Sequence, residues 1–410
     1  MRQTALLLLT AQTLMGMDLT SLLPHAKHNL RVESSRLEMQ QTQSQLDEAK
    51  TAYFPTLKLE GLYRKKDKAT AFEPKIVQGV ELGGSLTLFD GFRREAALKA
   101  LHASVDAASH TVEHEEQTVF METILAYYDY FDAASRLEAL QAKKTELLEQ
   151  IKRVSVLVEN DLATHDVLQS LIASKLEVEY NQQHEHIIRQ QSQKNLELLS
   201  GLPIDTLEYH DLMVKLPLHH ERHDLQADQL QVEFLHQSEQ NYTYLPTLAV
   251  QGKHKTLDYR NYDTMGGINL QPMNQNEITA SLSLTLFDAG RIAKEREQAR
   301  LMTLKAQKMV DYKRQRLHND EEISQLKLQA TQSALNAAQA EASARREAFA
   351  IIKKRFEVGL IPATTYLSEL SALSLSLAKV QTTHHALQVA YAHCAYASGM
   401  NLENLLEKQP

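Results

Sequence analysis

The chain has 410 residues, with 44 Lys and Arg against 52 Asp and Glu, so its net charge is −8. This mild acidity argues against nucleic-acid binding, which depends on a basic patch that the sequence lacks. The single cysteine, Cys394, excludes an intrachain disulfide, and the length alone would indicate two or three globular domains.

The first 17 residues have the pattern of an export signal. Arg2 supplies the positive charge, and residues 5–15 form an apolar core that is too short to span a membrane. No cysteine follows this core, so attachment of a lipid there is not expected. The alternative is that this segment is simply the start of a buried helix.

Two pairs of β-strands are predicted from a change in the spacing of apolar residues. A polar helix over residues 26–52 ends at Pro55, and the apolar period then falls from 3.6 to 2. Strands are predicted at about 56–65 and 79–89, and again at about 247–256 and 277–287. One face of these strands is apolar, carrying Leu57, Leu59, Gly61, Val80, Leu82, Gly84, Leu86, Leu88, Leu248, Val250, Ile278, Ala280, Leu282, Leu284 and Leu286.

The length of these strands, about ten residues, suits tilted strands that cross a membrane. Aromatic residues stand near the expected membrane boundaries, namely Tyr53, Phe54, Phe89, Tyr242, Tyr244 and Phe287. A small soluble hairpin with one face on a core is the alternative for any single strand, and four matched strands favour the membrane.

Long helices fill the remainder of the chain. No Gly or Pro occurs between Phe92 and Ser200, or between Arg291 and Val358, so helices can run without a break. The chain is expected to turn back near Asn160, where Asn tolerates the left-handed conformation and Thr164 is a candidate N-cap. The second turn is expected at Gly359, before Pro362. The predicted helices cover 92–158, 164–200, 291–357 and 363–398.

An internal repeat organises these elements. Residues 86–93 recur at 284–291, and Ser200-Gly201 recurs at Ser398-Gly399, both 198 residues later. The strand entry at 53–57 recurs at 244–248, which is 191 residues later. The sequence therefore predicts a mainly α protein of two repeats, 18–217 and 218–410, each a β-hairpin followed by a long α-helical hairpin.

The number of strands limits how they can span a membrane. Four strands cannot close a barrel, and open sheet edges in lipid leave backbone groups unpaired at several kcal/mol each. Several chains must therefore share one barrel. Eight strands enclose mainly side chains, so a conducting pore argues for three or more chains.

The chain resembles the TolC-like outer-membrane efflux proteins. The resemblance rests on the duplicated Phe-Asp-Gly-Arg turns, the Tyr-x-Pro-Thr-Leu strand entries, the Arg-Phe-Glu-Val-Gly-Leu segment at 355–360 and the two Ser-Gly helix ends. It implies a homotrimer with a twelve-stranded barrel in Gram-negative outer-membrane lipid, joined to an α-helical barrel in the periplasm. It also implies a passive exit duct in a tripartite efflux or type I secretion system, with a periplasmic adaptor protein and an inner-membrane transporter as partners.

The resemblance also implies particular site residues. Adaptor contacts are expected at Val358, Gly359 and Leu360, and at the poorer match Asn160, Asp161 and Leu162. Counting six and nine residues from each turn gives entrance-gate candidates Asp166, Thr365 and Ser368, with Glu369 adjacent. Asp166 has the alternative of capping a helix beside Thr164. The strand-to-helix turns are Phe89, Asp90, Gly91, Phe287, Asp288 and Gly290.

No catalytic site is predicted. His110 and His114 form one histidine cluster and His219, His220 and His223 another, but no H-E-x-x-H motif is present, and solvated helix surface is the favoured reading. Cys394 is expected to be a small packing residue. We therefore expect no enzyme activity, cofactor or metal. The rivals are a soluble or surface coiled-coil scaffold and a periplasmic metal-binding enzyme. The sequence does not identify the cargo.

Overall fold

The computed structural model describes residues 17–69, 74–212, 220–260 and 272–406. The predicted export signal and His219 therefore lie outside the described residues, apart from Met17. The elements in chain order are α1 (Leu19–Ala26), α2 (Leu30–Thr51), β1 (Thr56–Lys65), β2 (Ile76–Phe89), α3 (Arg93–Glu159), α4 (His165–Ser200), α5 (His223–Glu239), β3 (Thr247–Arg260), β4 (Asn274–Ser283), α6 (Arg291–Glu357), α7 (Ala363–Ala397) and the 3-10 helix η1 (Leu402–Leu405).

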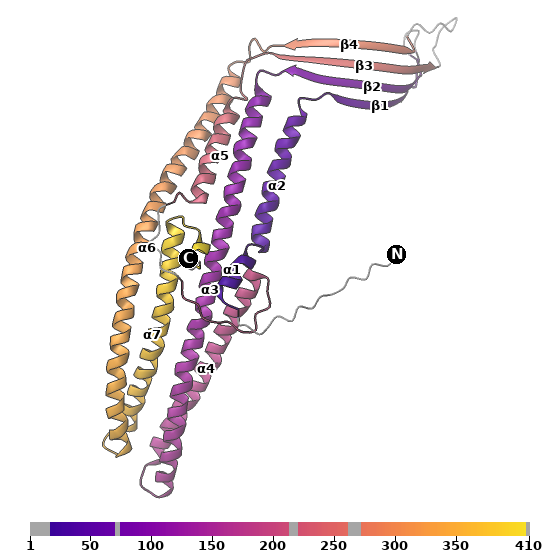
Figure 1. The fold of residues 1–410 in the computed structure, drawn as a ribbon. Helices are drawn as coiled ribbons and strands as arrows, with labels where there is room; N and C mark the ends of the chain where they lie inside the picture. Colours follow the sequence, from indigo (N-terminus) through magenta and orange to yellow (C-terminus); the bar gives the residue numbers. More distant parts are fainter. Residues whose placement is uncertain (1–16, 70–73, 213–219, 261–271, 407–410) are drawn as a thin grey trace. The chain divides into compact units, whose positions relative to one another are not determined.

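The predicted fold class is confirmed: long helices dominate, and the only described sheet is small and antiparallel. Each repeat contributes two strands and two long helices (Figure 1). Helices α3 and α6 have 67 residues each, which corresponds to roughly 100 Å at 1.5 Å per residue. The absence of Gly and Pro from both helices accounts for their length.

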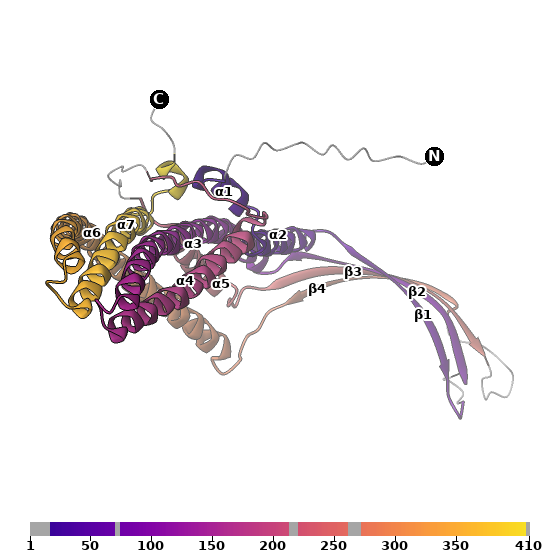
Figure 2. The same cartoon turned by 90° about the horizontal axis from the view of Figure 1, so that it is seen from below.

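The residues divide into two compact units. The first comprises residues 1–35, 111–224 and 313–410, and the second comprises residues 36–110 and 225–312. The first unit is helical and contains residues 111–159 of α3 with α4, and residues 313–357 of α6 with α7; the two helices of each hairpin lie side by side in both views (Figures 1 and 2). The second unit contains the whole sheet.

The first unit has a continuous apolar core. Leu19, Leu22 and Leu23 of α1 are fully buried, as are Phe120, Ile124 and Tyr127 of α3. Cys394 is 2% exposed, as expected for a small packing residue. Among the described residues, no helix is both long enough and apolar enough to cross a membrane.

The sheet has the order β1-β2-β3-β4 with every neighbour antiparallel. In the first hairpin Thr56 pairs with Ser85, and in the second Thr247 pairs with Ser283. The register brings the predicted apolar residues onto one face, because Leu57, Gly84, Gly252 and Ile278 lie in one row across all four strands. The apolar face predicted for each strand is therefore a single face of the sheet.

Several elements differ from the prediction. Strand β2 begins at Ile76 rather than 79, β3 ends at Arg260 rather than 256, β4 begins at Asn274 rather than 277, and helix α5 was not predicted. The polar helix expected over 26–52 is observed as α2, which begins at Leu30, and Ala26 is the last residue of a separate apolar helix, α1, that was not predicted. The strand expected over 277–287 is observed as β4 and ends at Ser283. Its partner β3 begins at Thr247, which pairs with Ser283, so residues 284–287 have no β3 residue opposite them.

Candidate functional site

The tip of the second helical hairpin, where α6 turns into α7, closes with a Schellman motif. Gly359 has φ +75°, its amide donates to the Phe356 carbonyl at 3.0 Å, and the Leu360 amide donates to the Arg355 carbonyl at 2.9 Å. These two bonds satisfy carbonyl groups that a helix end would otherwise leave unpaired. Pro362 then precedes the first residue of α7 in extended conformation.

The first tip, between α3 and α4, uses the same motif with an aspartate in place of the glycine. Asp161 has φ +55°, its amide donates to the Val158 carbonyl at 3.1 Å, and the Leu162 amide donates to the Leu157 carbonyl at 2.8 Å. The prediction that Asn160 is the turn residue is therefore wrong by one position. Asn160 instead donates from its side chain to the Val156 carbonyl at 2.7 Å.

This shift changes the count that selected Asp166. Six residues beyond Asp161 is Val167, whereas six beyond Gly359 is Thr365. Asp166 corresponds instead to Thr364, one helix position away. The sequence prediction failed here because Asn and Asp both tolerate the left-handed conformation, so residue type alone does not separate positions 160 and 161.

Apolar side chains project from both tips. Leu162 is 74% exposed and Leu360 is 73% exposed, and Val358 is similarly exposed. Large apolar side chains held in solvent at the end of a rigid helical hairpin are typical of a protein contact. Three of the predicted adaptor-contact residues, Leu162, Val358 and Leu360, are therefore exposed apolar side chains at the two tips.

The predicted entrance residues differ in their environments. Asp166, Thr365 and Ser368 are exposed. A hydrogen bond with the Thr164 hydroxyl lowers the pKa of the Asp166 carboxyl, and Thr164 stands at the N-cap position of α4 without a side-chain cap bond. Glu369 is paired within the chain, with its carboxylate 3.2 Å from the Arg345 guanidinium of α6.

A partly buried polar network that the sequence did not predict joins the two hairpins above the tips. Glu146 of α3 accepts hydrogen bonds from the Tyr366 hydroxyl at 2.6 Å, Lys353 Nζ at 2.6 Å and Gln150 Nε2 at 3.0 Å. Tyr366 belongs to α7 and Lys353 to α6. One carboxylate thus holds three of the four long helices together.

The environment of this network favours the ionised carboxylate. Burial alone would raise the pKa of Glu146, but the bonds from Lys353, Tyr366 and Gln150 lower it below its ordinary value. The bond to Glu146 in turn raises the pKa of Lys353. Burial, and then the Glu146 carboxylate, raises the pKa of Tyr366, so the tyrosine stays a neutral donor.

An apolar cluster surrounds the network. Tyr366 is fully buried and stacks on Phe356, with ring centroids 4.4 Å apart and an interplanar angle of 14°. The buried members of the cluster are Leu147, Val154, Leu171, Val178, Phe349, Tyr366 and Leu370. Sequence alone could not single out Glu146, because glutamates recur throughout α3 and only tertiary packing shows that this one meets Lys353 and Tyr366.

The predicted strand-to-helix turns contain aspartates that cap the long helices. Asp288 accepts bonds from the Gly290 and Ile292 amides, both at 2.9 Å, and from the Tyr244 hydroxyl at 3.1 Å. Asp90 accepts from the Arg94 amide at 3.0 Å. These bonds satisfy orphan amides in the first turns of α6 and α3. The two repeats therefore begin their long helices in the same way.

The packing around the two turns differs. Gly91 has φ +74°, and a Cβ there would come 2.9 Å from the Leu245 Cβ. Phe89 packs edge-to-face on Phe92, with ring centroids 5.2 Å apart. In the second turn Gly290 has open space around it, and Phe287 is 86% exposed.

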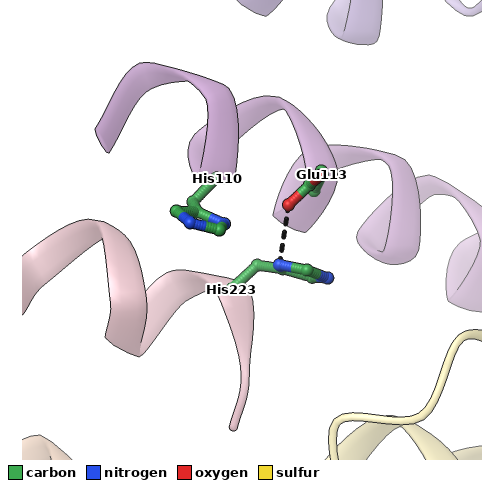
Figure 3. A group of neighbouring side chains, drawn as sticks. All are labelled: His110, Glu113 and His223. Carbon is green, nitrogen blue, oxygen red and sulfur yellow. Dashed lines mark ion pairs between the residues drawn. The ribbon is translucent and has the colours of Figure 1, made fainter. Parts of the chain in front are cut away.

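The histidine clusters are partly engaged in packing. His223, at the start of α5, lies 2.8 Å from the Glu113 carboxylate of α3 (Figure 3). Burial lowers the pKa of His114, whose ring lies 6.4 Å from the Tyr396 ring. A part of the surface predicted as solvated helix therefore carries an ion pair and an aromatic contact.

Comparisons with known proteins agree with this architecture. The chain resembles the CmeC outer membrane channel of Campylobacter jejuni with a TM-score of 0.80 and 14% identity, over 94% of this chain and 86% of that one. It resembles VceC, an outer membrane protein of Vibrio cholerae, with a TM-score of 0.77 and 15% identity, over 94% of this chain and 96% of that one.

The open-state MtrE outer membrane channel of Neisseria gonorrhoeae matches with a TM-score of 0.77 and 16% identity, over 95% of this chain and 91% of that one. At identities this low, the structural similarity shows a shared fold. No curated protein matches the sequence. The pattern of one family, described as outer membrane efflux protein, matches residues 25–174 and 218–393, which is most of the chain. The chain belongs to the outer membrane efflux protein family.

Proposed function

We propose that this protein is the outer-membrane channel of an efflux or secretion system and acts as a passive exit duct. Three copies would close a twelve-stranded barrel above a periplasmic helical tunnel. The observation that carries the proposal is the sheet, whose two faces have opposite character and whose apolar face is uncovered. Ile278 is 84% exposed and Leu57 is 73% exposed on that face.

The opposite face of the sheet suits a water-filled lumen. Lys58, Glu60, Glu81 and Lys253 line a polar hollow of about 230 Å³ on it. Glu81 lies 3.4 Å from Lys253 Nζ and 3.7 Å from Lys255 Nζ. A sheet with one apolar and one charged face is stable where lipid meets the first and water meets the second.

The partners that we propose are a periplasmic adaptor and an inner-membrane transporter, as the resemblance to TolC-like proteins implies. The exposed apolar residues at the two tips, Leu162, Val358 and Leu360, are the proposed contact with the adaptor. No nucleotide-binding motif occurs in the sequence, so the transporter would supply the energy for transport. The channel would supply only the path.

Opening of the periplasmic end would then require the two helical hairpins of each chain to separate at their tips. Within one chain, the bonds from Lys353 and Tyr366 to Glu146 hold the two hairpins together, while the Phe356–Tyr366 stack joins α6 to α7 within the second hairpin. The exposed hydroxyl and carboxyl groups at Asp166, Thr365 and Ser368 are the proposed lining of the entrance. Docking of the adaptor on the tips would shift the equilibrium between the closed and open forms of the entrance.

The substitution Gly359→Val tests the role of the second tip. Valine is strained at φ +75°, at a cost of about 1–2 kcal/mol, although no neighbouring atom lies within 4 Å to clash. We expect loss of pump-dependent drug resistance with a normal amount of trimer in the outer membrane. Gly201→Val is the matched control, because Gly201 has φ +70°, also in open space, at the other end of α4.

Normal resistance in the Gly359→Val strain would contradict the adaptor contact. Membrane fractionation with crosslinking tests the proposal as a whole. Recovery of a soluble monomer that gives no conductance in planar lipid bilayers would instead support the scaffold alternative.

A further inference from the structure

The structure carries a template for the junction between neighbouring copies of the chain. Strands β1 and β2 belong to the first repeat and β3 and β4 to the second, so the β2–β3 pairing joins the two repeats of one chain. Strands β1 and β4 are the edges of the sheet. If chains assemble in a closed ring, as the proposed function requires, β4 of one copy meets β1 of the next, which repeats the β2–β3 relation.

The two hairpins obey the repeat to the residue. Adding 191 to each β1 position and 198 to each β2 position converts the whole β1–β2 register into the β3–β4 register. Thr56–Ser85 becomes Thr247–Ser283, and Lys65–Ile76 becomes Thr256–Asn274. The same offsets are therefore a sound basis for carrying the β2–β3 register to the missing junction.

The end of β4 gives an independent indication. In the first repeat, residues 86–89 extend β2 beyond its last β1 pair, and they do so by pairing with β3, as in Leu86–Val250 and Phe89–Leu248. Their counterparts, residues 284–287, are not in a strand. Phe287 is 86% exposed, whereas Phe89 is partly covered. Residues 86–89 lie opposite β3, whereas no described strand of the same chain lies opposite residues 284–287.

We propose that residues 284–287 complete β4 by pairing with β1 of a neighbouring copy in the register carried over from β2–β3. Ser85–Gln251 becomes Ser283 opposite Glu60 of the neighbouring copy, and Leu86–Val250 becomes Leu284 opposite its Leu59. The irregularity between Thr87 and Phe89 falls at residues 285–287 and places Phe287 opposite Leu57 of the neighbour.

The chemistry of the two edges agrees with this register. Leu284 meets Leu59, Leu282 meets Gly61 and Ala280 meets Tyr63, so the apolar face continues across the junction. A shift by one residue would place apolar side chains on the polar face and is therefore excluded. Shifts by two residues keep the faces aligned and are the real competitors, which the experiment must separate.

Cysteine pairs test the register in the full-length protein with Cys394→Ser as background. The first pair is Ser283→Cys with Glu60→Cys, and its matched control within one chain is Ser85→Cys with Gln251→Cys. Opposed antiparallel residues alternate between two spacings. A second set, Leu284→Cys with Leu59→Cys and its control Leu86→Cys with Val250→Cys, therefore covers the other spacing. At least one set falls in the geometry that a disulfide accepts.

The intrachain control of each set shows whether that spacing allows a disulfide to form. For a set whose control forms its disulfide, we expect mild oxidation of the in-register pair to give covalent trimers on non-reducing gels. Ser283→Cys with Leu62→Cys, or with Lys58→Cys, should give less than about a tenth of that yield. Efficient crosslinking of either shifted pair, or of Ser283→Cys alone, would overturn the register. The register would also be overturned if the intrachain control formed its disulfide while the in-register pair formed none between copies, in a protein that still conducts. A protein that neither conducts nor forms trimers before oxidation would instead refute the proposed function.

Discussion

The bond between Glu146 and Tyr366 is expected to hold the two helical hairpins of each chain together near their tips. Tyr366 is fully buried, and its hydroxyl donates to Glu146 Oε1 at 2.6 Å. A hydrogen bond to an ionised group contributes about 1.5–3 kcal/mol. Tyr366→Phe and Glu146→Gln should therefore each destabilise the start of α7 relative to α3.

The two substitutions should also be coupled. Tyr366→Phe leaves Glu146 with Lys353 and Gln150, whereas Glu146→Gln removes the charge that all three donors share. A glutamine oxygen can still accept from the Tyr366 hydroxyl, so Glu146→Gln replaces a charged acceptor by a neutral one, whereas Tyr366→Phe removes the donor. Both changes weaken the same bond, so the double variant should lose less than the sum of the single losses. We expect a coupling free energy of about 1 kcal/mol, which is roughly fivefold in a local opening constant.

Hydrogen–deuterium exchange of the assembled full-length protein measures this opening. Peptides from the first turns of α7 should exchange roughly tenfold faster in each single variant, while peptides from the sheet should not change. Tyr180→Phe is the control, because Tyr180 on α4 is largely exposed and its ring has no comparable buried contact to lose. Strictly additive effects of the two substitutions, or unchanged exchange in α7, would refute the reasoning.

Two further predictions concern the first tip and the Glu146 network. Asp161→Gly should stabilise the first tip by about 0.5–1 kcal/mol, because Asp161 has φ +55° and glycine adopts that region without strain. Slower hydrogen exchange around Leu162 would show this, and an equal gain from Asn160→Gly would contradict it. Because the pKa of Glu146 is lowered from 4.5, its contribution should be complete above about pH 5 and lost as the pH falls below 4.5. Opening of α7, corrected for intrinsic exchange, should rise over that range in the wild type and stay flat in Glu146→Gln.

Much of the fold follows from patterns that are local in the sequence. The absence of Gly and Pro accounts for the two 67-residue helices, and strict alternation accounts for the strands and their common apolar face. The repeat adds long-range information, because it shows that each half contains the same elements in the same order.

The features that sequence reasoning missed depend on contacts that are not local. The left-handed residue of the first tip is Asp161 rather than Asn160, a choice made by the hydrogen bonds of the whole turn. Glu146 differs from other glutamates of α3 only in what packs around it. The end of β4 at Ser283 depends on whether a strand lies opposite residues 284–287, and the residue types within 284–287 do not indicate this.

The difference between the two tips has a consequence for any ring-shaped partner. A hexamer of identical single-repeat chains would offer six equivalent docking positions. Here each chain offers one tip that turns on Gly359 and one that turns on Asp161, so a ring of three chains alternates a neutral position with an acidic one. Because the two tips lie at different positions of one chain, their residues can differ, and a ring-shaped partner can bind one kind tightly while the other kind remains free to move.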